Sequence, residues 1–347
     1  MSSWIQRVGA LLGGRAAPPA APAARSRHRP AATARARVAV PPAAAPPPPA
    51  DTDPPAFAES MIPYPQLPFF EWLLDTGATL DVPLLPNEHR LLARLDAVLA
   101  ADASRADLLP RAPAVIPQLM NSLRDESQSA RALADRVAKD PNLVAEVIRL
   151  ANSTLARAAE PVSDLPQAIG RLGTQGLRRA IARVVLKPIF DAPGDSLSGR
   201  AAPRLWRHSE AKAAHCMRLA AAAGLDPFEG YLAGLMHNIG WTAALRALDK
   251  ARDAEGHARA QASPPFSRAF VQAFETRRET FFALLVMPWQ LTDSLTALAV
   301  ELLDGGLAAA TSKLGQALLA ADRDAALDVL GAGSLLENLT VTPPRSP

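Results

Sequence analysis

Cysteine is nearly absent from this chain of 347 residues, which holds Cys216 alone. A single cysteine excludes an internal disulfide and any zinc site built from several cysteines. No apolar run reaches the roughly 18 residues that a transmembrane helix needs, and no stretch alternates β-branched and polar residues as a half-buried strand does. These absences predict a cytoplasmic, all-α protein.

Acidic residues are missing from the first 50 positions, which hold ten prolines, sixteen alanines and seven arginines. Proline fixes the backbone and removes hydrogen-bond donors, so residues 1–60 are predicted to form a disordered tail. Trp4, Ile5 and Val8 repeat at helical spacing and predict a short amphipathic helix within residues 1–15. A frayed chain end is its simplest interpretation; a targeting peptide, a partner helix and membrane docking remain open. Membrane contact is expected only through this segment, if at all.

The basic character of the chain comes from this tail. With seven of the 37 basic residues removed, the remainder has 30 basic and 34 acidic side chains, a net charge of −4. A slightly acidic body argues against nucleic acid as a partner.

From residue 61 onward the sequence reads as a series of helices. Asp140 and Pro141 predict an N-cap and a first-turn proline, Asn152 and Ser153 predict the local capping of that helix's end, and Gly173 precedes a long helix that runs through Phe190. Further helices are expected over residues 86–99, 114–123, 128–139, 201–223, 227–237, 266–287, 289–303 and 314–338.

Six segments follow one another in a recognisable order: 109–123 (LPRAPAVIPQLMNSL), 140–143 (DPNL), 148–153 (IRLANS), 168–173 (AIGRLG), 206–209 (WRHS) and 233–240 (AGLMHNIG). This series resembles the HDOD domain, the HD-related output domain of bacterial signalling proteins, over about residues 106–305. The resemblance implies a regulatory, non-catalytic protein with an all-helical, two-lobed fold. A helical bundle would span 106–198 and a degenerate HD-type core 199–305, flanked by a helical extension (61–105) and a C-terminal helical segment and tail (306–347). We expect the extension to pack on the first lobe.

The resemblance also places a metal site. An HD phosphohydrolase holds divalent ions through histidines and a His-Asp pair and uses them to activate water against a phosphoester. His208 and His237 stand at two of these positions, but Asn238 replaces the aspartate of the pair. An asparagine offers one neutral oxygen and no negative charge to offset a cation.

The later ligand positions of the family are also altered. Arg278 stands where a histidine is expected, Leu302 and Leu303 replace a His-His pair, and Thr292 replaces a motif proline. His215, two turns after His208, is interpreted as a packing residue. We therefore expect no metal, no cofactor and no catalytic residue, with His208, His237 and Asn238 as relics of the site.

Arg178, Arg179, Arg183 and Lys187 share one helix and form a candidate surface for an acidic ligand or partner, although a solvated basic face is the simpler interpretation. Aromatic residues for stacking on single-stranded nucleic acid are not interleaved with them. The function predicted from the sequence is a non-catalytic signal-transduction or scaffold protein that binds a protein partner. The alternatives are a nucleotide sensor that uses the relic HD cleft and a divergent metal-dependent phosphohydrolase.

Overall fold

The computed structural model describes residues 66–102, 105, 107–109, 134, 135, 137–139, 141–153, 161–254 and 265–331. The helices are α2 (Gln66–Leu74), α3 (Pro86–Ala100), α7 (Pro141–Ser153), α8 (Leu165–Phe190), α9 (Leu197–Ala222), α10 (Pro227–His237), α11 (Ile239–Ala254), α12 (Arg268–Val286), α13 (Asp293–Gly305) and α14 (Lys313–Leu330), with two short 3-10 turns, η1 (Met287–Trp289) and η2 (Leu307–Ala309). Within these ranges no strand occurs, and one isolated bridge joins Leu80 and Ser267. The all-α prediction is confirmed.

Side chains just before the helices explain where most of them begin. In each case a hydroxyl or carboxylate oxygen accepts a hydrogen bond from an N–H of the first turn, which stabilises a helix by about 1 kcal/mol. The caps are Asp164, Ser196, Asp226, Ser267, Thr292 and Ser312. Pro141 begins α7, as predicted.

Two glycines mark the interruptions that the sequence predicts. Gly173 has a φ of 64° and a ψ of −175° and divides α8 into two helical parts. Gly224, with a φ of 75°, follows the end of α9. Residues with a Cβ rarely adopt such backbone angles, whereas glycine does so readily. The chain therefore changes direction at these two positions.

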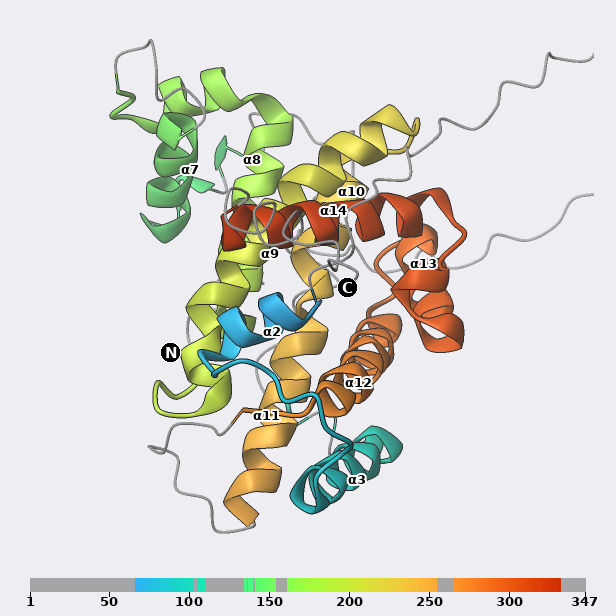
Figure 1. Ribbon diagram of the computed structural model, residues 1–347. Coiled ribbons are helices and arrows are strands. Elements are labelled where there is room, and N and C mark those ends of the chain that lie inside the picture. Colours follow the sequence, from blue (N-terminus) through green and yellow to red (C-terminus); the bar gives the residue numbers. More distant parts are fainter. Residues whose placement is uncertain are drawn as a thin grey trace, which may run out of the picture. The chain divides into compact units, whose positions relative to one another are not determined.

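Helix α9 is the central element of the described region (Figure 1). Helices α10 and α14 pack along it, α11 packs on α12, and α7 packs on α8. Gly234 allows the close approach of α10 to α9, since a Cβ at this position would lie 2.7 Å from the Cα of Ala213. This close packing sets how deep His237, the last residue of α10, lies in the core.

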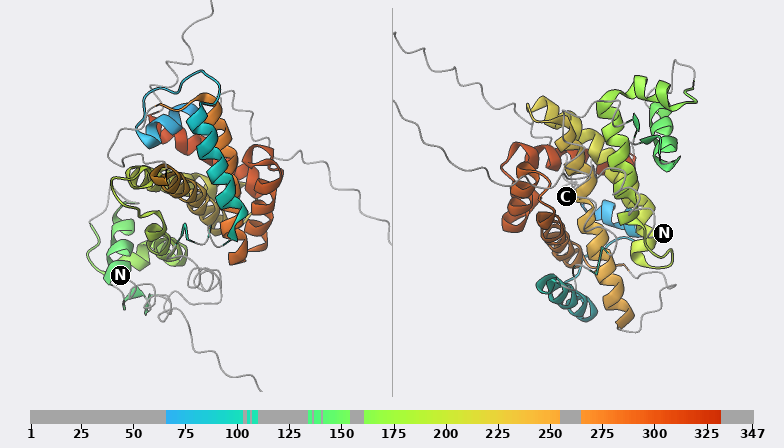
Figure 2. Two further views of the ribbon diagram at one scale, coloured as in Figure 1. Left: turned by 90° about the horizontal axis from the view of Figure 1, so that it is seen from below. Right: turned by 180° about the vertical axis from the view of Figure 1, so that it is seen from behind.

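The extension formed by α2 and α3 packs on a different part of the molecule from the one predicted. Among the described residues, α2 contacts α9, α12 and α14, and α3 contacts α11 and α12. Figure 2 shows α3 lying beside α12. Aromatic packing explains this placement, because the ring centres of Phe69 and Phe70 of α2 lie 5.8 and 6.0 Å from that of Trp241. Such aromatic pairs strengthen a core beyond simple burial, so the expected packing on the first lobe is wrong for the described residues.

Three helix boundaries also differ from the predictions. Helix α14 ends at Leu330 rather than 338, because Gly331 leaves the helical conformation with a φ of 80°. Helix α9 begins at Leu197 rather than 201, because Ser196 caps it and the Asp249 carboxylate accepts from the Leu197 and Ser198 amides at 2.8 and 3.0 Å. Helix α13 begins at Asp293 rather than 289, because Gln290 adopts a left-handed conformation with a φ of 45°.

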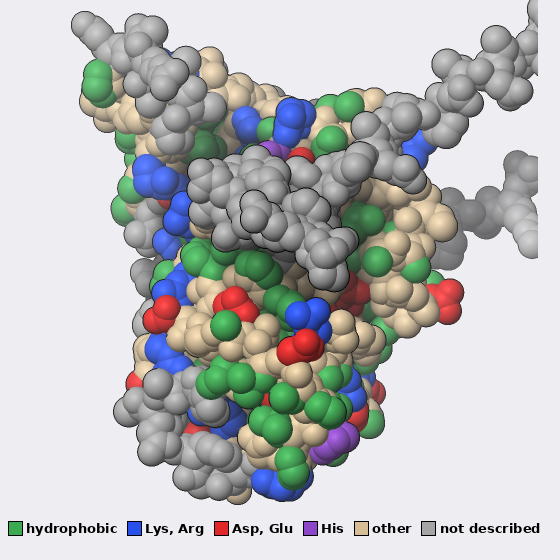
Figure 3. Space-filling view, viewed as in Figure 1, with side chains coloured by type: hydrophobic (Ala, Val, Ile, Leu, Met, Phe, Trp, Pro, Cys, Tyr) green, Lys and Arg blue, Asp and Glu red, His purple; other side chains and the backbone are tan. Residues whose placement is uncertain are grey.

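Several predictions lie outside the described residues: the tail, the amphipathic helix of residues 1–15, the helix over 114–123 and most of the helix over 128–139. Within the described ranges, no helix is both long and apolar enough to cross a membrane. Charged side chains on the face seen in Figure 3 are scattered among polar and apolar ones rather than gathered in one patch.

Candidate functional site

The fold brings His208, His237 and Asn238 together, as the resemblance implies. His208 lies on α9, and His237 and Asn238 lie at the carboxyl end of α10. The Asn238 amide Nδ2 donates to His208 Nδ1 at 3.0 Å and to Ser209 Oγ at 2.9 Å. All three motif side chains are completely buried. They therefore form part of the core rather than the floor of an open cleft.

Lys212 occupies the middle of this group. It follows His208 by one helical turn on α9, and its side chain is also completely buried. The ammonium Nζ donates to Asn238 Oδ1 and to Asp322 Oδ1, both at 2.6 Å, and lies 3.0 Å from His237 Nδ1. Three polar atoms from two segments, the end of α10 and helix α14, therefore lie around one tethered cation.

The carboxylate of the group comes from a distant part of the chain. Asp322 lies on α14, 110 residues after Lys212, and its side chain is only 3% exposed. Its backbone carbonyl lies 3.4 Å from His208 Nε2, which donates to it because Nδ1 accepts from Asn238. Asp322 thus ties α14 to α9 through both its side chain and its backbone.

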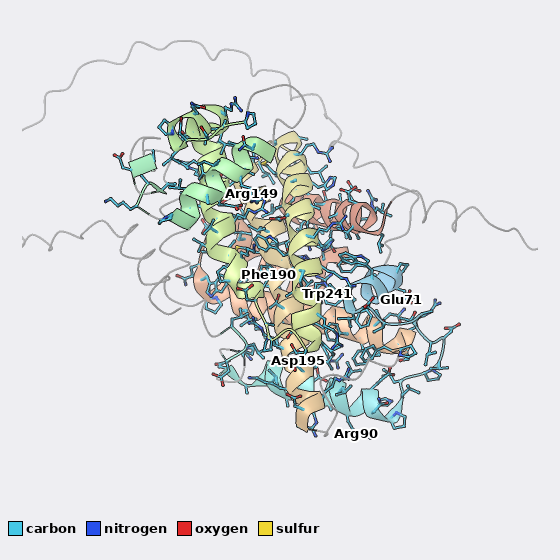
Figure 4. The ribbon with its side chains drawn as sticks, turned by 90° about the vertical axis from the view of Figure 1, so that its left-hand side faces the viewer. Glu71, Arg90, Arg149, Phe190, Asp195 and Trp241 are labelled. Atoms are coloured by element: carbon cyan, nitrogen blue, oxygen red, sulfur yellow. The ribbon has the colours of Figure 1, made fainter. Side chains whose placement is uncertain are left out.

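A second cation, Arg278 of α12, lies on the other side of His237. Its Nη1 is 3.2 Å from His237 Nε2, its Nε donates to Glu275 Oε2 at 2.5 Å, and its guanidinium lies 5.4 Å from the ring centre of Trp241. Trp241 lies among the packed helices, whereas Arg90 lies at the lower edge of the view (Figure 4). A neutral imidazole has one acceptor nitrogen, so His237 accepts from either Lys212 or Arg278 at any moment.

Burial and the neighbouring charges decide the protonation states. Burial, together with the Lys212 charge, lowers the pKa of His208 to about 3 and that of His237 well below its usual value. Burial lowers the pKa of Lys212 to about 8. Burial acts to raise the pKa of Asp322, but the charges of Lys212 and Arg278 outweigh it and hold that pKa well below the usual value. At neutral pH the cluster therefore contains neutral histidines and a charged Lys212–Asp322 pair.

Aromatic rings close the cluster from two sides. The ring of Phe69, on α2, lies 4.4 Å from the ring of His208, and the ring of Phe282 lies 5.3 Å from that of His237. Both phenylalanines are completely buried. Neither histidine is therefore open to a molecule arriving from solvent.

The donor set does not fit a divalent metal. The atoms that would ligate an ion, His237 Nδ1, Asn238 Oδ1 and Asp322 Oδ1, all lie within 3.0 Å of the Lys212 ammonium. A cation placed among them would meet that positive charge and, beyond His237, the charge of Arg278. Across the described residues, no group of three or more His, Cys, Asp or Glu side chains is arranged to hold a metal.

Comparison with known proteins identifies the family. The family model described as the HDOD domain matches residues 109–301, which is 193 of the 347 positions. The chain belongs to the HDOD domain family. The match ends before α14 and begins after α3, so the HDOD region itself contains Lys212 but neither Asp322 nor Phe69.

Individual relatives of this HDOD protein are distant. An uncharacterized protein of Treponema pallidum (strain Nichols) is 20% identical over 173 residues, which cover 49% of this chain and 33% of the relative. The chain therefore matches about one third of that relative's length. An HDOD domain protein of unknown function from Geobacter sulfurreducens is 23% identical, with a TM-score of 0.47, and the match covers 75% of this chain and 83% of that one. A structure from Shewanella amazonensis SB2B named "Putative metal-dependent phosphohydrolase" is 18% identical, with a TM-score of 0.47 and coverage of 74% and 86%.

The other motif positions and His215 supply no metal ligand to the two buried histidines. Thr292 caps α13, where its Oγ1 accepts from the Leu295 amide at 2.8 Å. Leu302 is buried in the core and Leu303 is 40% exposed. His215 lies at the surface, with its Nε2 2.7 Å from the carboxylate of Asp328.

The four basic residues of α8 do not form one exposed surface. Arg178 is buried and Lys187 is exposed. Arg183 pairs with Glu146 of α7 at 2.7 Å and with Glu210 of α9, so it connects three helices. Arg179 is half-buried, with its Nη1 3.5 Å from the sulfur of Met217.

The capping residues are placed as follows. Asn152 holds the segment before α8: its Nδ2 donates to the Val162 carbonyl at 3.0 Å, and its Oδ1 accepts from the Val162 amide at 2.8 Å. It therefore bridges ten residues rather than capping its own helix end. Asp140 and the side chain of Ser153 lie outside the described residues.

Lys212 and Asp322, the charged pair at the centre of the cluster, were not predicted from the sequence. A signal for Lys212 was present, because it follows His208 by four residues and therefore lies on the same face of α9, among alanines at 211, 213 and 214. No local pattern marks Asp322, which α14 brings in from outside the family match.

A cavity of about 490 Å³ lies elsewhere, between the end of α8, the start of α9 and α11. Its wall includes Leu108, Ile189 and Arg246, and none of the three motif residues. The Arg246 guanidinium donates to the carbonyls of Leu108 at 2.5 Å and Ile189 at 2.9 Å. This arginine therefore holds the cavity wall together.

Proposed function

We propose that this HDOD protein is a non-catalytic module that acts in signal transduction through contacts with a protein partner. The observation that carries the proposal is the burial of His208, His237 and Asn238 with their polar atoms turned toward one another, Lys212 and Arg278. Phosphoester hydrolysis needs a metal-bound water that reaches the substrate. Here the donor atoms surround a lysine instead, and phenylalanine rings cover the two imidazoles.

The same geometry argues against nucleotide binding in the HD cleft. A phosphate needs open donors, and the donors of Lys212 and Arg278 are turned toward Asp322, Asn238 and Glu275. A ligand would have to displace Phe69 or α14 to reach them. We therefore rank the nucleotide sensor and the divergent phosphohydrolase below the protein-binding module.

A hydrolysis assay on the full chain tests the proposal. The protein is incubated with Mn²⁺ or Mg²⁺ and a general phosphodiester, bis-p-nitrophenyl phosphate, and then with a cyclic dinucleotide. We expect the wild type and His237→Ala to release product at the rate of the protein-free blank. Turnover by the wild type that His237→Ala abolishes would make the protein an enzyme and overturn the proposal.

The partner is sought by cross-linking in the source cells followed by mass spectrometry. We expect the same cross-linked protein with the wild type and with a folded His237→Gln variant, because binding would not use the histidine cluster. Loss of that protein with the folded variant would assign the cluster a direct role in recognition.

A further inference from the structure

We propose that Lys212 is a built-in cation that takes the place of a divalent metal, and that Asp322 supplies the carboxylate that position 238 lacks. The proposal rests on the non-catalytic function proposed above and deepens it. The HD pattern without its aspartate suggests an empty relic, whereas the geometry points to a site that is filled by the chain itself.

The surroundings of the ammonium are those of a small coordination site. Asn238 Oδ1 and Asp322 Oδ1 each lie 2.6 Å from Nζ, and His237 Nδ1 lies 3.0 Å from it. His237 and Asp322 belong to the residue types that bind zinc and similar ions. The ammonium satisfies them through hydrogen bonds and carries one positive charge in place of two.

Removing the lysine would leave His208, His237 and Asp322 as candidate ligands, with Arg278 still beyond His237. Asp322 Oδ1 lies 3.7 Å from His208 Nε2 and 4.0 Å from His237 Nδ1. Two ligands bound tetrahedrally to one ion at about 2.1 Å lie about 3.4 Å apart. As they stand, these side chains do not form a metal site, so they would have to move closer together to share an ion in the absence of Lys212.

Asn238 matches the lysine rather than a metal. Its oxygen accepts from Lys212, while its Nδ2 donates to His208 Nδ1 and lies 3.3 Å from the Leu205 carbonyl. An aspartate has no hydrogen to offer on that second side. Restoring the family's aspartate alone would leave the lysine in place, so a metal site would need both an aspartate at 238 and the removal of Lys212.

Co²⁺ binding by four forms of the full chain tests the inference. The forms are the wild type, Asn238→Asp, Lys212→Ala, and the double variant Lys212→Ala with Asn238→Asp, and Lys187→Ala is the control for removing an exposed lysine. After equilibrium dialysis and a circular dichroism check of folding, we expect about one Co²⁺ per chain in the double variant and weaker binding in Lys212→Ala. The wild type, Asn238→Asp and Lys187→Ala should retain none. Adding His237→Gln to the double variant should weaken binding at least about tenfold.

The outcomes separate this inference from the proposed function. A folded double variant that binds no Co²⁺ overturns the inference and leaves the non-catalytic proposal standing. Co²⁺ bound by the wild type at the histidines overturns the inference as well, and whether the wild type also hydrolyses a phosphodiester then decides the proposed function.

A measurement on the wild type keeps the inference testable if the lysine variants do not fold. The chain has only five lysines, and an exposed ammonium exchanges its hydrogens with water too fast to be seen by NMR at neutral pH. A buried, fully hydrogen-bonded ammonium exchanges slowly. We expect one lysine ammonium signal, which persists when Lys139, Lys187, Lys250 and Lys313 are each replaced by arginine. Its absence in the folded wild type overturns the inference.

Discussion

Replacing Asp322 by asparagine removes the carboxylate that touches the Lys212 ammonium while keeping the shape of the side chain. At 2.6 Å and an effective dielectric constant of about 20, the attraction between the two charges is about 6 kcal/mol. Breaking one partner of a buried ion pair costs about 3–5 kcal/mol, because the other charge stays buried without its partner. The amide oxygen still accepts a hydrogen bond, so we expect a loss of about 3 kcal/mol.

Urea denaturation of the full chain at pH 7 measures this loss. Asp328→Asn is the matched control, since Asp328 lies on the same helix and pairs with His215 at the surface. Exposed pairs contribute little, and the control should change the free energy of unfolding by less than about 1 kcal/mol. If Asp322→Asn costs no more than Asp328→Asn, Lys212 does not depend on this carboxylate and the charge assignment of the cluster is wrong.

The pH dependence of the loss provides a second check. Burial lowers the pKa of Lys212 to about 8 in the wild type, and losing the carboxylate should lower it further. Where the folded lysine is neutral and the unfolded one is charged, the unfolded chain binds more protons and stability rises with pH. That rise should begin at a lower pH in Asp322→Asn, so the gap to the wild type should narrow between pH 7 and 8. A constant gap would contradict the assignment.

Three further predictions concern the core and the backbone. The two buried histidines have lowered pKa values, so below about pH 6.5 the unfolded chain binds more protons than the folded one. Each histidine should therefore lower the free energy of unfolding by up to about 1.4 kcal/mol per pH unit. Urea denaturation curves that coincide at pH 7 and pH 5 would contradict this. Phe69→Ala should lower the free energy of unfolding by about 3–5 kcal/mol. Leu80→Ala, at an exposed position, should change it by less than about 0.5 kcal/mol. Equal effects of the two changes on thermal unfolding would contradict the packing of α2 in the core. Gly173→Ala should lower the free energy of unfolding by about 1–3 kcal/mol, because Gly173 has a φ of 64°. Its control, Gly170→Ala, lies within the helix and should be neutral or stabilising. A neutral Gly173→Ala would argue against the break in α8.

The sequence was sufficient for the local features of the fold. Caps and first-turn prolines act within a few residues, and apolar spacing identifies a helix from one turn to the next. The start of α7, the break at Gly173 and the end of α9 before Gly224 could therefore be predicted. The contacts of α2 could not, because the partner of Phe69 depends on which distant ring, here Trp241, the fold brings to it.

The residues of the candidate site likewise divide into those that local sequence predicts and those that only the fold brings in. His208, His237 and Asn238 could be found because they lie in short motifs with fixed spacing. Lys212 could have been found, since a lysine one turn from a buried histidine must either pair or leave the core. Asp322 could not, because its partnership spans 110 residues and α14 shares no motif with the domain. The sequence thus indicates which residues differ from the HD pattern, and only the packing of α14 shows which groups surround the two histidines.

A chelator distinguishes a built-in cation from a bound one. A metal that binds only the folded state adds stability that depends on its concentration, about 2.7 kcal/mol at 100 times its dissociation constant, and EDTA removes that stability. Lys212 is attached to α9 and cannot be extracted. We expect the melting temperature of the wild type to be the same in EDTA and in Mn²⁺, whereas EDTA should lower that of the Co²⁺-loaded double variant Lys212→Ala with Asn238→Asp. A wild type destabilised by EDTA would mean that an ion, rather than the lysine, holds α9, α10 and α14 together.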